Sequence, residues 1–256
     1  MTFFAPACIA FILGAVIGSF LNVCIYRIPA GESIVHPPSR CPACGSGIRW
    51  YQNVPVVSYL LLGGKCAACK VRISPRYPLV EALTGLLFVV VLYRFGFQWA
   101  TPVYWLFAAA LIVITFIDLD HQIIPDVISL PGIVVGFLCS FAIPWLSWGD
   151  SLIGILVGGG SLYLVAVGYE LLTKKEGMGG GDIKLLAMIG AFLGWQAILP
   201  VIFLSSFVGS LVGVPVMLLK KADSKLAIPF GPFLAAAALF YLFWGPPLIR
   251  WYLGLF

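Results

Sequence analysis

Long apolar runs separated by short polar segments divide this chain. The runs cover 3–26, 79–97, 102–117, 127–146, 151–172, 185–195, 197–219 and 226–245. A helix crosses the hydrocarbon core of a bilayer with ~20 residues, and most of the runs approach or reach that length. The run 185–195 is short, but it follows a glycine-rich segment and ends at a turn-like Trp-Gln pair. The pattern predicts an all-α polytopic membrane protein with about eight transmembrane helices; six or seven are the alternatives.

Composition supports this class. Hydrophobic residues make up 61% of the chain and charged residues only 10%, whereas soluble domains carry about 25% charged residues. A net charge of +5 could indicate a nucleic-acid partner, but no polar segment interleaves basic with aromatic residues. The first 26 residues lack the basic start and small-residue cleavage site of a signal peptide, so they predict a retained first helix.

The cations predict an orientation. With segment 27–78 in the cytosol and alternating spans thereafter, thirteen of the fifteen Lys and Arg residues fall in cytosolic segments, and only Arg94 and Arg250 fall outside. Positively charged loops remain on the cytosolic side of membrane proteins. Both termini are therefore expected outside, and the net charge needs no nucleic acid.

Three parts of the chain are predicted to differ in role. Residues 1–26 form the first transmembrane helix, residues 27–78 a cytosolic loop, and residues 79–256 the remaining membrane-embedded part. The loop is rich in Pro, Gly and Ser and has few apolar residues for a core. So small a unit usually needs disulfides, a metal or oligomerisation to fold.

Four cysteines in the loop indicate that metal. They form two Cys-x-x-Cys pairs with 21 residues between them: Cys41, Cys44, Cys66 and Cys69. Paired cysteines at this separation are typical of a tetrahedral four-thiolate zinc site. Two disulfides are the alternative, but cytosolic thiols stay reduced. A closed four-thiolate site is structural, and zinc binding would supply folding free energy to the loop.

Two carboxylates are the candidate catalytic pair. Asp118 lies near the end of the third predicted span, and Asp182 directly precedes the short sixth span at the same membrane face. Ionisable residues at membrane depth are costly and therefore suggest function. Two carboxylates sharing a proton can hydrolyse a peptide, one as general base and the other as proton donor. The helix dipole favours ionisation of Asp182, so we expect it to be the base.

Other interpretations of these acids remain open. Asp182 could be only a helix N-cap, and Asp118, Asp120 and Asp126 could be a solvated loop edge. Glu81 and Glu176 also lie near predicted helix ends. Gly179, Gly180 and Gly181 precede Asp182, where they would let a substrate backbone approach and allow positive φ. The glycines at 158–160 are instead expected to permit close helix packing.

Several stretches together resemble the type IV prepilin peptidases, a family of intramembrane aspartyl peptidases with a Gly-x-Gly-Asp signature. That signature is matched by Gly-Gly-Gly-Asp182. Further matches are Gly18-Ser-Phe-Leu-Asn-Val-Cys-Ile-Tyr-Arg-Ile-Pro29, the double Cys-x-x-Cys, Arg76-Tyr-Pro-Leu-Val-Glu81, Ile117-Asp118 and Ile-Pro-Asp126. The resemblance covers residues 10 to 220.

The resemblance implies a bifunctional enzyme of the bacterial inner membrane. Such enzymes remove the short basic leader of prepilins and pseudopilins at the cytosolic face, then N-methylate the new terminal residue with S-adenosylmethionine. By position, Asp118 and Asp182 are the catalytic pair, and the zinc loop belongs to the methyltransferase half. Membrane lipid is the expected surrounding, and no nucleic acid is expected. The alternative is a non-enzymatic transporter or assembly factor whose carboxylates line an ion path.

Overall fold

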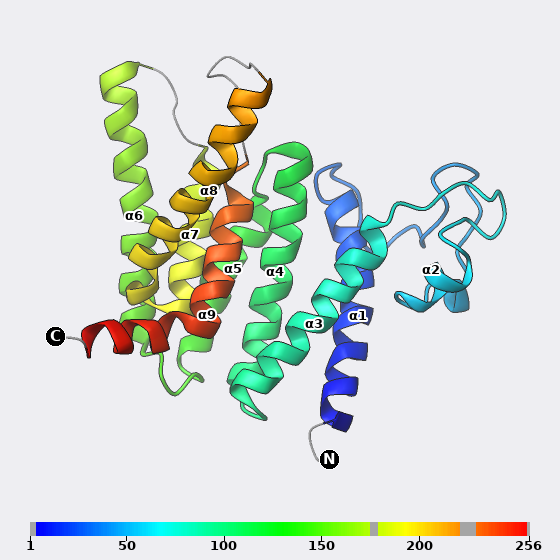
Figure 1. The fold of residues 1–256 in the computed structure, drawn as a ribbon, viewed down its shortest axis with the longest axis horizontal. Helices are drawn as coiled ribbons and strands as arrows, with labels where there is room; N and C mark the ends of the chain where they lie inside the picture. The colour runs from blue at the N-terminus through cyan, green and yellow to red at the C-terminus, as the bar shows by residue number, and fades with distance from the viewer. Residues whose placement is uncertain (1–3, 175–178, 221–228, 255–256) are drawn as a thin grey trace. The chain divides into compact units, whose positions relative to one another are not determined.

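Helices make up the architecture of the chain. The computed structural model describes residues 4–174, 179–220 and 229–254, and this part holds nine α-helices, two short 3₁₀ helices and no strand. The chain forms two compact units, Met1–Val113 and Ile114–Phe256 (Figure 1). The division between them falls within helix α4 (Ala100–His121).

In the first unit, α1 (Phe4–Arg27) packs along α3 (Arg76–Phe95). Small residues allow the two backbones to approach: a methyl group on Gly14 would lie 2.8 Å from the Cα of Gly85. The side-chain amide of Asn22 donates to the carbonyl of Tyr77 (3.1 Å). The start of α4 is fastened to α3 by Trp105, whose indole N–H donates to the carbonyl of Phe88 (2.9 Å) while the two rings stack.

In the second unit, α7 (Gly180–Leu193) lies among the other helices (Figure 1). It packs between α5 (Asp126–Ser140) and α6 (Trp148–Thr173), and it also contacts α8 (Ile198–Lys220) and α9 (Gly231–Leu253). Residues 185–192 of α7 are buried without interruption. A segment surrounded in this way must be apolar on every side, as its sequence is.

Glycines let α6 and α7 approach each other. Gly154 and Gly190 face each other so closely that a methyl group on either would overlap the other's backbone. A methyl group on Gly158 would lie 2.6 Å from the carbonyl oxygen of Leu186. The prediction of close packing is therefore confirmed at Gly158, whereas Gly160 has open space around it.

The predicted fold class is confirmed. Eight helices correspond to the eight apolar runs, and six described helices are long and apolar enough to cross a membrane. Helices α5 and α7 are shorter, with 15 and 14 residues. The run 127–146 overstates α5 because apolar residues continue through the turn that follows Ser140. The division of roles at residues 26 and 78 remains a prediction.

Candidate functional site

Asp118 is a buried carboxylate in the last turn of α4. Its side chain is 4% exposed, and its Oδ2 accepts a hydrogen bond of 2.9 Å from the backbone N–H of Gly231. Gly231 is the first residue of α9. The first N–H groups of a helix have no partner within the helix and carry the positive end of its dipole. The start of α9 therefore stabilises a negative charge on Asp118.

Asp182 is the third residue of α7 and half-buried. The residue that caps this helix is Gly179, so the interpretation of Asp182 as the N-cap is wrong. Asp182 lies close enough to Asp118 for the two charges to interact. Burial, and to a smaller extent the charge of Asp118, raise the pKa of the Asp182 carboxyl to about 6. The second unit thus brings together two carboxyl groups that are far apart in the sequence.

The two carboxyls differ in the groups that surround them. The dipole of its own helix made Asp182 the expected base. The N–H of Gly231 supports the charge of Asp118, while Asp182 is disfavoured as an anion. Which of the two carboxyls is the base therefore stays a prediction.

The three glycines before Asp182 differ from one another. Added methyl groups on Gly179 and Gly180 would meet nothing within 4 Å, whereas one on Gly181 would lie 2.8 Å from the Cβ of Ile124. None of the three has a positive φ, so the expectation of that backbone conformation is wrong here. Gly181 allows the segment after α4 to pack against α7. Gly179 and Gly180 leave open space beside Asp182.

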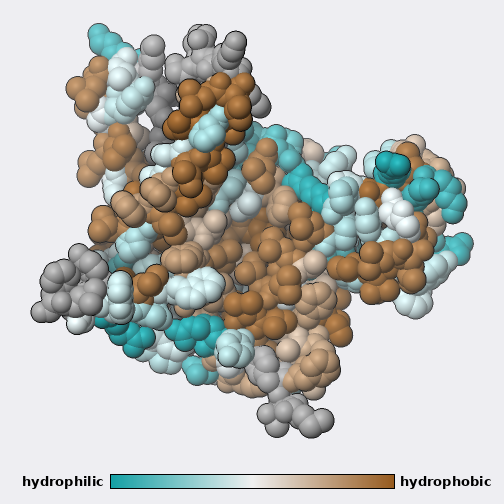
Figure 2. Space-filling model, in the orientation of Figure 1, coloured by the Kyte–Doolittle hydropathy of each residue, from teal (hydrophilic) through white to brown (hydrophobic). Residues whose placement is uncertain are grey.

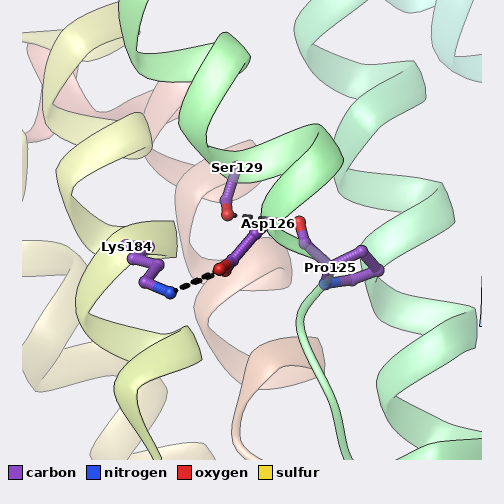
Figure 3. Close-up of polar contacts among 4 residues, drawn as sticks. All are labelled: Pro125, Asp126, Ser129 and Lys184. Atoms are coloured by element: carbon purple, nitrogen blue, oxygen red, sulfur yellow. Dashed lines mark hydrogen bonds and ion pairs between the residues drawn. The ribbon is translucent and has the colours of Figure 1, made fainter.

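An ion pair fastens the start of α5 to α7. The ammonium group of Lys184 donates to both carboxylate oxygens of Asp126, at 2.7 and 2.8 Å (Figure 3). The hydroxyl of Ser129 donates to the carbonyl of Pro125 (3.2 Å), which closes the first turn of α5. Asp126 is exposed, as expected of a solvated loop edge, and it also links two helices. Both side chains are accessible, so the pair orients the helices more than it stabilises them.

Other acids named from the sequence have different surroundings. Asp120 is exposed near the end of α4, and Glu176 lies outside the described residues. Glu81 belongs to the first unit, where its buried carboxylate accepts a hydrogen bond of 2.7 Å from the backbone N–H of Val56 in the loop.

The four loop cysteines form a cluster with the dimensions of a metal site. The sulfur atoms of Cys41, Cys44, Cys66 and Cys69 all lie within 4.8 Å of one another. The sulfurs of Cys41 and Cys69 are 3.9 Å apart. Tetrahedral zinc with Zn–S bonds of about 2.3 Å requires sulfur–sulfur distances of just under ~4 Å. The cluster therefore fits zinc, and its four thiolates would leave no open position for catalysis.

Each cysteine pair sits in the same kind of turn. The N–H of Gly45 donates to the carbonyl of Cys41, and the N–H of Lys70 donates to that of Cys66. Gly45 and Lys70 both follow the second cysteine of their pair with φ above +60°. These turns aim two sulfur atoms of each pair toward a common point, which is the arrangement that the spacing predicted.

Gly231 is a candidate site residue that the sequence did not reveal. It precedes Pro232 at the start of an apolar run, and this context predicts only the beginning of a helix. Nothing in the local sequence shows that the first N–H of that helix meets a carboxylate of α4. A methyl group on Gly231 would lie 2.7 Å from Oδ2 of Asp118, so glycine is required for this contact.

Family models match most of the chain. Residues 12–95 match the bacterial peptidase A24 N-terminal domain, and residues 105–214 match the type IV leader peptidase family. No solved structure matches the chain.

Curated proteins are similar over nearly the whole length. A prepilin leader peptidase/N-methyltransferase of Pseudomonas aeruginosa is 43% identical, with 94% of this chain and 91% of that protein aligned. A protein of the same description from Aeromonas hydrophila is 40% identical, with 96% of this chain and 93% of that protein aligned. A third, from Neisseria gonorrhoeae, is 41% identical, with 90% of this chain and 87% of that protein aligned. The chain therefore belongs to the type IV leader peptidase family.

Proposed function

We propose that this chain cleaves the leader peptide from type IV prepilins or pseudopilins with the carboxyl groups of Asp118 and Asp182. The main support for the proposal is that these two carboxyl groups lie close enough in the second unit for their charges to interact. One of them is buried and held by the start of α9, and the other lies beside the open space at Gly179 and Gly180. Family membership and the names of the relatives supply the substrate class.

The arrangement supports hydrolysis by a shared proton. The ionised Asp118 takes a proton from a water molecule, whose oxygen attacks the scissile carbonyl carbon. The protonated Asp182 donates its proton to the carbonyl oxygen, which gives a neutral tetrahedral diol. Collapse of this diol breaks the C–N bond, and the proton now on Asp118 passes to the leaving amine. Both carboxyls then return to their starting states, because the diol hydroxyl restores the proton of Asp182.

The second activity is methylation of the new N-terminus. The relatives are named N-methyltransferases, and S-adenosylmethionine would be the methyl donor. It would supply a methyl group to the terminal amine, which would lose a proton, and S-adenosylhomocysteine would be released. We assign the zinc loop to this half of the reaction. Zinc would be held there by the four cysteines and would act by stabilising the loop.

The reaction takes place at the cytosolic face of the bacterial inner membrane in this proposal. The six membrane-capable helices and the asymmetry of the cations support such an orientation, with segment 27–78 inside. A membrane-impermeant label applied to intact cells should miss a probe placed near Pro55. Labelling of that probe from outside would contradict the orientation.

Leader release by purified protein tests the proteolytic function. Protein reconstituted in lipid nanodiscs is incubated with a synthetic prepilin, and mass spectrometry detects the free leader and the methylated product. Asp118→Asn and Asp182→Asn should each abolish leader release while zinc content and membrane insertion remain. Asp120→Asn is the matched control, because Asp120 is exposed in the same helix turn. Undiminished release by Asp182→Asn would refute the aspartyl mechanism, and a transporter would release no leader at all.

A further inference from the structure

A group of apolar and aromatic side chains lies exposed on the zinc loop. It consists of Trp50, Tyr51, Val57, Leu60 and Leu61, whose exposed fractions run from 47% to 84%. We call this group the loop patch. Its members come from the 3₁₀ helix Trp50–Gln52 and from α2 (Val57–Leu61), which pack against each other. A soluble segment rarely exposes so contiguous an apolar surface unless something covers it.

The loop is held beside the helices of the first unit, not beyond their ends. The carboxylate of Glu81, five residues into α3, accepts the N–H of Val56, the residue directly before α2. Val56 has φ of 61°, a conformation that a β-branched residue rarely adopts. The hydrogen bond from Val56 to the buried carboxylate of Glu81 thus fixes the start of α2 beside the first turns of α3, although the backbone of Val56 is strained.

Contacts between the loop and α1 place the loop at the same depth along the helices. A cavity of about 310 Å³ is lined by Val16 and Phe20 of α1 together with Asn53 and Pro55 of the loop. Val16 precedes the end of α1 at Arg27 by eleven residues, which is about 16 Å along a helix axis. The segment that leads into α2 therefore runs beside the part of α1 that is apolar enough to lie in a membrane.

The arrangement of the loop in space agrees with this depth. Figure 1 shows α2 level with the middle of α1 rather than past the end where α1 enters the loop. Figure 2 shows hydrophobic residues gathered on the side of the loop that carries α2, and hydrophilic residues on the opposite side. A bilayer crossed by α1 and α3 would meet the hydrophobic side of the loop.

The charge of the loop indicates the chemistry of the surface that it meets. Segment 27–78 contains seven Lys and Arg residues and one acid, Glu32. Arg49, Lys65 and Arg72 are exposed, and the guanidinium group of Arg49 donates to the hydroxyl of Tyr51 within the loop patch. Aromatic and apolar side chains next to cations are the composition of segments that lie in a membrane interface and bind anionic lipids.

We propose that the loop patch inserts among the acyl chains of the cytosolic leaflet, while the cations on the hydrophilic side of the loop bind anionic phospholipid headgroups. The apolar residues of the patch then continue the lipid-facing surface of α1, where Val16 and Phe20 are also exposed. The zinc site lies in the same loop and is thereby held at the membrane surface. This proposal needs the membrane-spanning fold but not the proteolytic function.

Depth-dependent quenching in the full-length protein tests the proposal. Leu61 is replaced by a genetically encoded fluorescent amino acid, and the zinc-loaded protein is placed in nanodiscs of phosphatidylglycerol with brominated or ordinary acyl chains. We expect blue-shifted emission at position 61 and a loss of fluorescence in brominated discs. The matched control places the same probe at Ser46, which is exposed in the turn of the first cysteine pair. We expect no quenching there.

Three results would overturn the proposal. The first is quenching at position 61 no stronger than at position 46. The second is blue-shifted emission at position 61 with the same intensity in brominated and ordinary lipid, because a protein surface rather than acyl chains would then cover the patch. The third is a signal that appears only when prepilin is added. Changing Arg49, Lys65 and Arg72 together to Gln should remove the preference for phosphatidylglycerol over phosphatidylcholine, and retention of that preference would refute the headgroup contact. An unchanged zinc content shows that each variant has kept its loop fold.

Discussion

Replacing Gly231 by alanine tests whether the start of α9 sets the position and charge of Asp118. In the structure, the N–H of Gly231 donates to Oδ2 of Asp118 at 2.9 Å. A methyl group on Gly231 would lie 2.7 Å from that oxygen and 3.2 Å from the carboxyl carbon. Ordinary van der Waals contact begins at 3.4 Å. The carboxylate, or the start of the helix, must therefore move by several tenths of an ångström.

The expected loss follows from two effects that overlap. A hydrogen bond to a charged group contributes about 1.5–3 kcal/mol, and its loss corresponds to about 10- to 100-fold in rate. A misplacement of ~1 Å at a reacting group costs up to ~10²-fold. Because both effects arise from one displacement, we expect kcat for leader cleavage to fall by about 10- to 100-fold. KM should change little, since the contact does not involve substrate.

The assay compares Gly231→Ala with Gly160→Ala, which places the same methyl group in open space on α6. Leader cleavage is measured over a range of prepilin concentrations and pH. The acidic limb of the pH–rate profile should move to higher pH in Gly231→Ala, because the ionised form of the base has lost a donor. Methylation of pilin that has already been cleaved serves as an internal control and should be unchanged.

The reasoning is refuted if Gly231→Ala cleaves prepilin as fast as Gly160→Ala with an unmoved acidic limb. Loss of both cleavage and methylation would instead show that the variant has not folded. In that event Gly231→Ser, whose hydroxyl can itself donate to Asp118, distinguishes the explanations. Partial recovery of cleavage by serine relative to alanine supports the role of the donor, and equal inactivity contradicts it.

Three further predictions concern other parts of the chain. Asp182→Asn should stabilise the protein at pH 7.5 by up to about 3 kcal/mol, because the pKa of Asp182 rises from 3.8 to about 6 and each pH unit corresponds to about 1.4 kcal/mol. The folded state keeps a proton that the unfolded state releases, so the cost of this carboxyl is present above pH 6 and vanishes as pH falls toward 4. Thermal unfolding in detergent at both pH values measures it, and an equal difference at pH 7.5 and pH 4 would contradict it. Gly181→Ala should lower thermal stability because its methyl group would lie 2.8 Å from Ile124, whereas Gly180→Ala should leave thermal stability unchanged; equal stability of the two variants would show that this packing is unimportant. Cys44→Ser should release zinc, increase amide hydrogen exchange in the loop and reduce methylation more than cleavage; metal analysis that finds zinc fully retained would exclude four-thiolate binding.

The sequence alone determined the class of protein and much of the candidate site. Apolar runs long enough for a bilayer predicted the helices, because the length and composition that a membrane demands are local properties of the chain. The spacing of the cysteines predicted the metal cluster for a similar reason, since each pair forms its own tight turn. Asp118 and Asp182 could be named because they lie at the ends of apolar runs at the same membrane face, where a charge is costly.

Only the tertiary structure shows the surroundings on which the roles of these carboxyls depend. The dipole of the helix that each aspartate belongs to made Asp182 the expected base. The structure places the first N–H of α9, a helix more than a hundred residues away in sequence, against Asp118. It also buries Asp182 near that charge. Ionisation depends on neighbours from every element packed around a group, and those neighbours are not adjacent in the sequence.

The short α5 and α7, the link from Lys184 to Asp126 and the burial of Glu81 against Val56 were likewise decided by packing. Hydrophobicity continues through the turn after Ser140, so the pattern of residues could not locate the end of α5. A hydrogen bond that a backbone carbonyl accepts or a backbone N–H donates between helices cannot be recognised from the amino-acid sequence. The helical membrane class of the chain therefore follows from local properties of its sequence. The contacts between groups that are distant in the sequence depend on the fold.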